Sequence, residues 1–144
     1  MKDEEVLDNL IEVVELILDL TTTSVSVVPL NTVIKTAGEN ITSYTPIAII
    51  GDLAYKFDIL NPAHQFAFLG FSLTGVSVGA DCLIQLDGEI TLTGWGLTPN
   101  KQYLAGTAGS ISLTNATAGF TKVVGFSVNS NTLMIIKGYT SINK

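Results

Sequence analysis

The stretch of residues 70–90 constrains the fold of this chain most, because it combines a strand pattern with a turn signal. Four apolar residues between 71 and 78 alternate with small residues, and this two-residue period is typical of a half-buried β-strand. Asp87-Gly88 then separates two further apolar runs, and Asp-Gly at such a place is typical of a type I′ turn. The sequence therefore predicts a hairpin at Asp87-Gly88, at the centre of a small antiparallel β domain.

Short apolar runs separated by turn residues continue over most of the chain, from residue 25 onwards. Gly51-Asp52 has the composition of a second two-residue hairpin turn, and Pro99-Asn100 suits the middle of a type II turn. We therefore expect an all-β fold, an antiparallel β-sandwich or a barrel-like body over residues 25–144. The expected strands are 25–28, 32–36, 46–50, 53–57, 66–69, 102–105, 110–113, 122–128 and 132–136.

A weak internal echo supports two packed sheets. Gly70-Phe71-Ser72-Leu73, followed by the apolar run at residues 83–88, resembles Gly125-Phe126-Ser127-Val128, followed by the apolar run at residues 133–138. Hairpins share such patterns by chance, so the echo is supporting evidence only.

The pattern of residues 1–20 predicts an amphipathic helix. Residues 21–24 (Thr-Thr-Thr-Ser) are expected to end this helix and to form a linker, because β-branched and hydroxyl residues disfavour the helical conformation. The apolar stripe has a 3-4-3 spacing, and four acids occupy the other face. A helix of this length is marginal alone in water. It is therefore expected to pack on its own domain, on sister helices or on another protein. The proposed oligomerisation or docking residues are Leu7, Leu10, Val14 and Ile17.

The charge is divided between these two parts of the chain. Residues 1–20 hold seven acids and one lysine, whereas residues 21–144 hold six lysines and six acids. The body thus has no net charge, and the chain has no arginine, so we expect no nucleic-acid partner. The apolar part of residues 6–20 is too short and too acidic to span a membrane, and the acidic start is unlike a secretory signal.

The residues that usually carry catalysis are sparse. The single histidine, His64, lies in a proline-containing loop, and the single cysteine, Cys82, sits beside apolar residues, where a buried and inert thiol is expected. Neither a hydrolytic triad nor a metal-ligand cluster can be built from them, so we expect no enzyme and no cofactor or metal. Gly94-x-Gly96 begins a dinucleotide fingerprint, but Pro99 breaks it.

Two aromatic residues, Trp95 and Tyr103, raise a different possibility. Together they would suit a stacking platform for a sugar ring, since the glycines beside Trp95 would expose it. The alternative is that Trp95 packs over the edge of the core or at a subunit contact.

The order of several short motifs resembles the β domain of tailed-phage virion fibres and capsid-decoration proteins. The likeness covers roughly residues 40–138, and Asn100 (usually Gly) and Phe126 (usually Ala) depart from the family pattern. The motifs that carry it are Gly70, Gly79, Leu83 to Ile90, Trp95, Gly96 to Asn100, Tyr103-Leu104, Gly109 to Ile111, Gly119-Phe120, Val124 to Ser127 and Leu133 to Ile135.

This resemblance implies a structural protein of the virion, made in the host cytoplasm, that forms a homotrimer and has no catalytic activity. A head fibre or capsid-decoration protein is the first expectation. Residues 1–20 would then bundle with their copies or dock into the major capsid protein or another virion protein. The alternative is a carbohydrate- or receptor-binding module like that of a tail fibre, in which a glycan would contact Trp95 and Tyr103.

Overall fold

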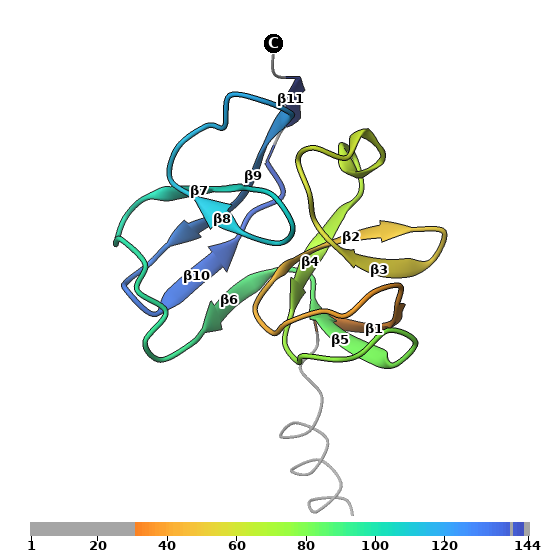
Figure 1. The fold of residues 1–144 in the computed structure, drawn as a ribbon. Helices are drawn as coiled ribbons and strands as arrows, with labels where there is room; N and C mark the ends of the chain where they lie inside the picture. Colours follow the sequence, from red (N-terminus) through yellow and green to blue (C-terminus); the bar gives the residue numbers. More distant parts are fainter. Residues whose placement is uncertain (1–30, 139, 143–144) are drawn as a thin grey trace, which may run out of the picture. The chain divides into compact units, whose positions relative to one another are not determined.

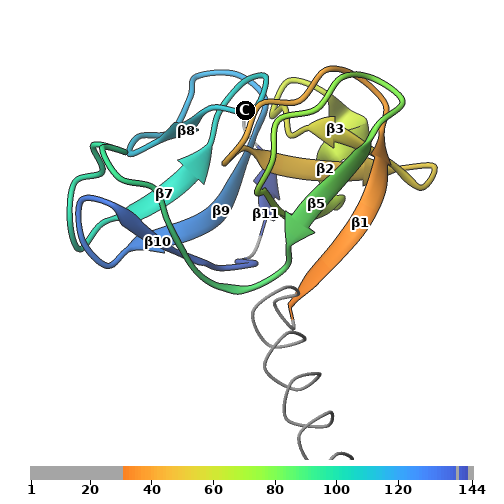
Figure 2. The same cartoon turned by 90° about the horizontal axis from the view of Figure 1, so that it is seen from below.

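The structure is a computed structural model, and it describes residues 31–138 and 140–142. These residues form eleven β-strands and one short 3-10 helix, which confirms the predicted all-β body. The strands divide into a closed barrel and a second, open sheet that lie side by side (Figures 1 and 2). The predicted helix of residues 1–20, the linker 21–24 and the first expected strand at 25–28 lie outside the described residues.

The first five strands close into a small barrel in the order β1-β3-β2-β4-β5. They are β1 (Thr32–Ala37), β2 (Pro46–Ile50), β3 (Leu53–Lys56), β4 (Phe68–Ser72) and β5 (Asp81–Gln85), and the 3-10 helix η1 (Pro62–His64) precedes β4. The strands pair antiparallel except at the seam between β1 and β3, which run parallel. The prediction of a wholly antiparallel body needs correction there. The barrel is filled by Ala37, Ile41, Ile47, Ala54, Cys82 and Ile84.

The other six strands form the open sheet, in the order β6-β10-β9-β7-β8, with β11 beside β9. They are β6 (Gly88–Thr91), β7 (Gln102–Ala105), β8 (Ile111–Ser112), β9 (Phe120–Ser127), β10 (Thr132–Ile135) and β11 (Thr140–Ile142). The long strand β9 organises this sheet, since β7, β10 and β11 all pair with it in antiparallel fashion.

The hairpin predicted at Asp87-Gly88 is wrong. Strand β5 pairs with β1 and β4, and β6 pairs with β10, so this dipeptide carries the chain from the barrel to the open sheet. A type I′ turn needs positive φ at both central residues, and of these two only Gly88 has it, at 83°. The hairpin predicted at Gly51-Asp52 is confirmed, because both residues have positive φ, 57° and 66°.

Three further turns agree with the sequence. Asn100 has a φ of 61°, as the turn predicted at Pro99-Asn100 requires. The strands expected at 102–105 and 110–113 pair with each other as β7 and β8, and those expected at 122–128 and 132–136 pair as β9 and β10. Local turn chemistry therefore predicted the hairpin at Gly51-Asp52, whose two strands are neighbours in the barrel.

The barrel and the open sheet repeat one topology. Strands β1 to β5 correspond to β6 to β10, because the orders β1-β5-β4-β2-β3 and β6-β10-β9-β7-β8 match strand by strand. The register matches as well, since the pairs Ile47↔Gly70 and Tyr103↔Gly125 are each followed by a bulge at the same step. The two copies differ in closure. Strand β3 reaches β1, whereas the two-residue β8 ends the open sheet.

A fully buried serine holds a loop in each copy of the repeat. Ser72 ends β4 and Ser127 ends β9. The Ser72 Oγ donates to the carbonyl of Thr42 at 2.7 Å and accepts from the amide of Thr45 at 3.0 Å. The Ser127 Oγ does the same to the loop of residues 98–101, donating to one carbonyl and accepting from one amide at 2.9 Å. The Ser72 hydroxyl thus stabilises the loop that leads into β2, and the Ser127 hydroxyl stabilises the loop that leads into β7.

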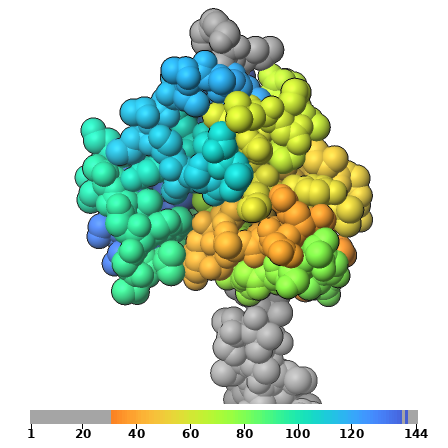
Figure 3. Space-filling model, viewed as in Figure 1, coloured from red at the N-terminus to blue at the C-terminus, as the bar shows by residue number. Residues whose placement is uncertain are grey.

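The largest core lies between the two copies of the repeat. Barrel residues such as Phe57 and Phe71 enter it from one side, and open-sheet residues such as Phe120 and Leu133 from the other. Phe57 makes edge-to-face contacts with the rings of Phe68 and Phe120, both at 5.6 Å between centroids. Figure 3 shows the orange-to-green surface of the barrel directly against the blue surface of the open sheet. The open sheet therefore packs against the outer surface of the barrel, and the larger core lies between the two.

Candidate functional site

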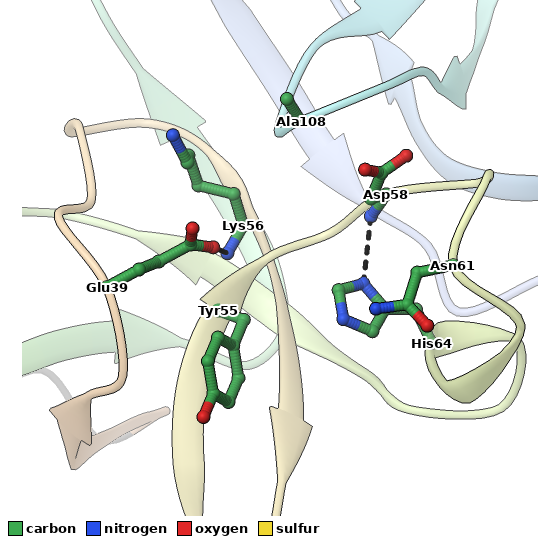
Figure 4. A pocket seen from close by; sticks show the side chains of 7 residues that line it. All are labelled: Glu39, Tyr55, Lys56, Asp58, Asn61, His64 and Ala108. Carbon is green, nitrogen blue, oxygen red and sulfur yellow. Dashed lines mark hydrogen bonds between the residues drawn. The ribbon is translucent and has the colours of Figure 1, made fainter.

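A small polar pocket lies at the end of β3, beside the turn between β7 and β8 (Figure 4). Its volume is about 220 Å³. Pockets for small-molecule ligands usually measure about 300–1,000 Å³, so this one suits a small polar group. The lining residues are Glu39, Tyr55, Lys56, Asp58, Asn61, His64 and Ala108.

The helix η1 brings His64 to the pocket. Pro62 occupies the first turn of η1, where its fixed φ suits a helix start, and the Asn61 side chain accepts from the amide of Ala63 at 3.0 Å. The short helix turns the chain back toward β3, so that the His64 ring contacts the rings of Tyr55 and Phe57, with centroids 6.5 and 5.8 Å away. The sequence predicted a loop at this place, and the structure has one helical turn within it.

His64 is held by the backbone. It is 5% exposed, and its Nδ1 accepts from the amide of Asp58 at 3.0 Å. Burial lowers the pKa of His64 below its ordinary value, while the carboxylates of Asp58 and Glu39 act in the opposite direction. The ring is therefore neutral at pH 7. Since Nδ1 is the acceptor, the proton lies on Nε2.

This tautomer limits what the pocket can do chemically. The Nε2–H of His64 is a hydrogen-bond donor, and a general base needs a free lone pair. Taking up a proton would instead need the Nδ1 lone pair that holds the amide of Asp58. Glu39 is engaged in a similar way, because its Oε2 accepts from the amide of Lys56 at 2.8 Å. Both side chains therefore hold the backbone around the pocket, and the pocket offers hydrogen bonds.

Among the residues that the structure describes, no group of three or more His, Cys, Asp or Glu side chains is placed to hold a metal ion. Cys82 is fully buried in the barrel, and burial raises the pKa of its thiol. The prediction of a buried thiol is confirmed.

The proposed sugar platform is not formed as expected. Tyr103 is only 6% exposed, and its hydroxyl accepts from the amide of Thr98 at 2.9 Å, so its ring belongs to the core. Trp95 is partly buried against the same core and makes an edge contact with Tyr44, with ring centroids 5.8 Å apart. Trp95 therefore packs over the edge of the core, which was the alternative expectation for it.

Leu7, Leu10, Val14 and Ile17, the proposed docking residues, lie outside the described part of the chain and stay a prediction. The structure adds exposed apolar residues that the sequence analysis missed. Phe66, next to η1, is 84% exposed, and Phe126 and Met134 lie on the outside of the open sheet. A signal for the last two existed, because apolar residues occupy both alternating positions of β9 and β10, which indicates strands covered on both faces.

The chain matches no protein-family model and no curated protein sequence. Within residues 31–138 and 140–142, no helix is long and apolar enough to cross a membrane. Function must therefore be argued from the residues themselves.

Proposed function

We propose that this chain is a structural protein of a tailed-phage virion, a head fibre or a capsid-decoration protein. It attaches through residues 1–20 and projects the β body of residues 25–144 from the particle. The proposal rests on the order of motifs over residues 40–138, which resembles the β domains of such proteins, and on the surface of the body.

The observation that carries the proposal is that the β body has no net charge and exposes several large apolar side chains. The body holds six lysines and six acids, so identical copies do not repel one another. Several large apolar side chains nevertheless point to solvent: Ile34 (62% exposed), Leu60 (55%), Phe66 (84%) and Val78 (62%). These side chains lie on different elements, so they support the proposal only together with the order of motifs over residues 40–138.

Residues 1–20 supply the attachment in this proposal. All of the net charge of the chain lies in this segment, and its apolar stripe needs a partner. Three copies bundle through Leu7, Leu10, Val14 and Ile17, or each copy docks into the capsid through the same residues. In either arrangement the assembly is a homotrimer, located in the virion.

Mass spectrometry of purified phage particles tests the virion role, and light scattering of the full chain tests the trimer. We expect the chain among the virion proteins and a stable trimer in solution. The double substitution Leu10→Asp and Ile17→Asp is expected to abolish the trimer or the attachment. A chain that is absent from particles and unaffected by this substitution would refute the proposal. Glycan binding that Trp95→Ala abolishes would favour a receptor-binding module instead.

A further inference from the structure

The outer face of the β9–β10 hairpin carries a compact apolar patch. Met134 lies directly opposite Phe126, and opposite residues of paired strands share a face. Val128 and Ile136 directly follow the ends of β9 and β10, their amides bond to the carbonyls of Thr132 and Val124, and in extended chain they share the face of the residues two positions before them. The four side chains of this outer patch are each more than a third exposed: Phe126, Val128, Met134 and Ile136.

The outer patch lies in the middle of one row across four strands. Glu89 of β6 pairs with Met134 of β10, Met134 pairs with Phe126 of β9, and Phe126 pairs with Gln102 of β7. The row thus has two apolar side chains in its centre, a carboxylate at one end and an amide at the other. This layout, an apolar centre with a polar rim, is typical of protein interfaces.

The corresponding row in the barrel is covered at two of its four positions, whereas the counterparts of Met134 and Glu89, which are Gln85 and Thr32, are half-buried. By the repeat, Phe71 corresponds to Phe126, and Pro46 corresponds to Gln102, since Pro46 pairs with Phe71 as Gln102 pairs with Phe126. Pro46 and Phe71 are both fully buried, and Phe71 belongs to the core that the open sheet forms on the outside of the barrel. Leu73, the counterpart of Val128, packs on the same core. Protein therefore covers Phe71 and Pro46 on this face in one copy of the repeat, whereas the counterpart Phe126 in the other copy is 37% exposed.

We propose that a second copy of this chain covers the outer patch, in a twofold contact between two open sheets. Sheets pack face to face with their strands nearly aligned. A twofold axis parallel to the strands places Met134 of each chain against Phe126 of the other. It also places Glu89 of each chain against Gln102 of the other, so that a carboxylate meets an amide donor at both ends of the row.

The row itself argues for a second copy over a different partner. It is self-complementary under this axis, as a twofold interface requires, and no like charges meet across it. The body has no net charge that would oppose the contact. Figures 1 and 2 show β9 and β10 in the part of the body remote from β1 and β3, and the four side chains of the outer patch are each more than a third exposed. The contact goes beyond the proposed function, because it joins bodies in pairs and does not involve residues 1–20.

Sedimentation equilibrium of the full chain tests the proposal. The double substitution Leu10→Asp and Ile17→Asp is used as the background, so that association through residues 1–20 is weakened and the body contact is measured. We expect a monomer–dimer equilibrium between micromolar and near-millimolar concentrations. Phe126→Asp is expected to give monomers, whereas Phe66→Asp, an exposed ring outside the patch, is expected to leave the dimer unchanged.

Two substitutions of Gln102, an exposed residue, give the sharpest result. Gln102→Lys sets an ammonium against Glu89 of the second copy and should tighten the dimer, and Gln102→Glu sets a carboxylate there and should weaken it. Each effect is expected to be about two- to thirty-fold in the dissociation constant, because a rim ion pair is worth about 0.2–1 kcal/mol and occurs twice. Within one chain the two positions are three strand spacings, roughly 14 Å, apart, so the opposite effects need a second chain.

The alternative outcomes are equally clear. A background chain that stays monomeric over the whole concentration range overturns the proposal. A dimer that survives Phe126→Asp, or that responds alike to both Gln102 substitutions, places the contact elsewhere and also overturns it. Absence of a trimer in the unsubstituted chain would instead refute the bundling of residues 1–20, and absence of the chain from phage particles would refute the virion role. The dimer of bodies is measured separately in the substituted background, so the failures are distinguishable.

Discussion

Replacement of either buried serine by alanine should destabilise the body by a similar amount. Ser72→Ala removes the acceptor for the amide of Thr45 and the donor for the carbonyl of Thr42. A buried polar group without a partner costs about 1–3 kcal/mol, so two such groups cost about 2–6 kcal/mol. Thr42 is itself exposed, and water can reach part of its loop. We therefore expect the free energy of unfolding to fall by about 2–4 kcal/mol, the lower part of that range.

Ser127→Ala should give the same loss, because Ser127 fastens the 98–101 loop with the equivalent pair of bonds. Urea unfolding measures it, with the single tryptophan Trp95 as a fluorescence probe in the shared core. One transition is expected, since the two copies of the repeat share that core. Its midpoint should fall by about 1–2 M urea in both variants.

Ser110→Ala is the matched control. The Ser110 Oγ also donates to a backbone carbonyl, that of Thr107 at 2.8 Å, but in an exposed turn where water replaces it. Its substitution should cost no more than about 0.5 kcal/mol. If Ser72→Ala and Ser127→Ala cost as little as this control, the two serines do not hold the loops and the reasoning is refuted.

Three other predictions concern the core and the pocket. Phe71→Ala should cost about 3–5 kcal/mol in urea unfolding, because Phe71 is fully buried between the two copies of the repeat; a cost below 1 kcal/mol would contradict that packing. His64→Asn keeps an acceptor for the amide of Asp58 but has no group that titrates near neutral pH. Because the pKa of His64 is lowered in the folded chain, the unfolded state takes up the proton first as the pH falls. The unsubstituted chain should therefore lose stability relative to the variant as the pH falls through and below 6.5. Equal pH profiles would show that the pKa of His64 is not lowered in the folded chain. Cys82 should react with a thiol reagent only at the rate of unfolding, because it is fully buried and its thiol pKa is raised; fast labelling of the folded chain would contradict this.

The sequence predicted what is local in this fold. The hairpin at Gly51-Asp52, the turn at Pro99-Asn100 and the buried Cys82 follow from the residues at those positions. The Asp87-Gly88 hairpin failed because the partners of β5 are β1 and β4, and a dipeptide carries no information about pairing with distant strands.

Local sequence patterns could not predict the parallel pairing of β1 with β3 or the structural repeat, because both depend on pairing between distant strands. Whether β3 reaches β1 depends on how far the barrel curls, and no residue pair in the sequence specifies it. Tyr103 misled the site prediction because an aromatic residue beside glycines suits a platform and a core equally well. Its counterpart in the barrel, Ile47, is completely buried, and the echo of Gly70–Leu73 in 125–128 was the one signal that could have placed both inside.

Hydroxyl-radical footprinting of the full chain, read out by mass spectrometry at several concentrations, tests most directly which faces the protein covers. In dilute solution we predict oxidation of Phe126 and Met134 and protection of Phe71. As the concentration rises, Phe126 and Met134 should become protected, while Phe66 stays reactive. Equal oxidation of Phe71 and Phe126 in dilute solution, or reactivity at Phe126 and Met134 that does not change with concentration, would contradict the account.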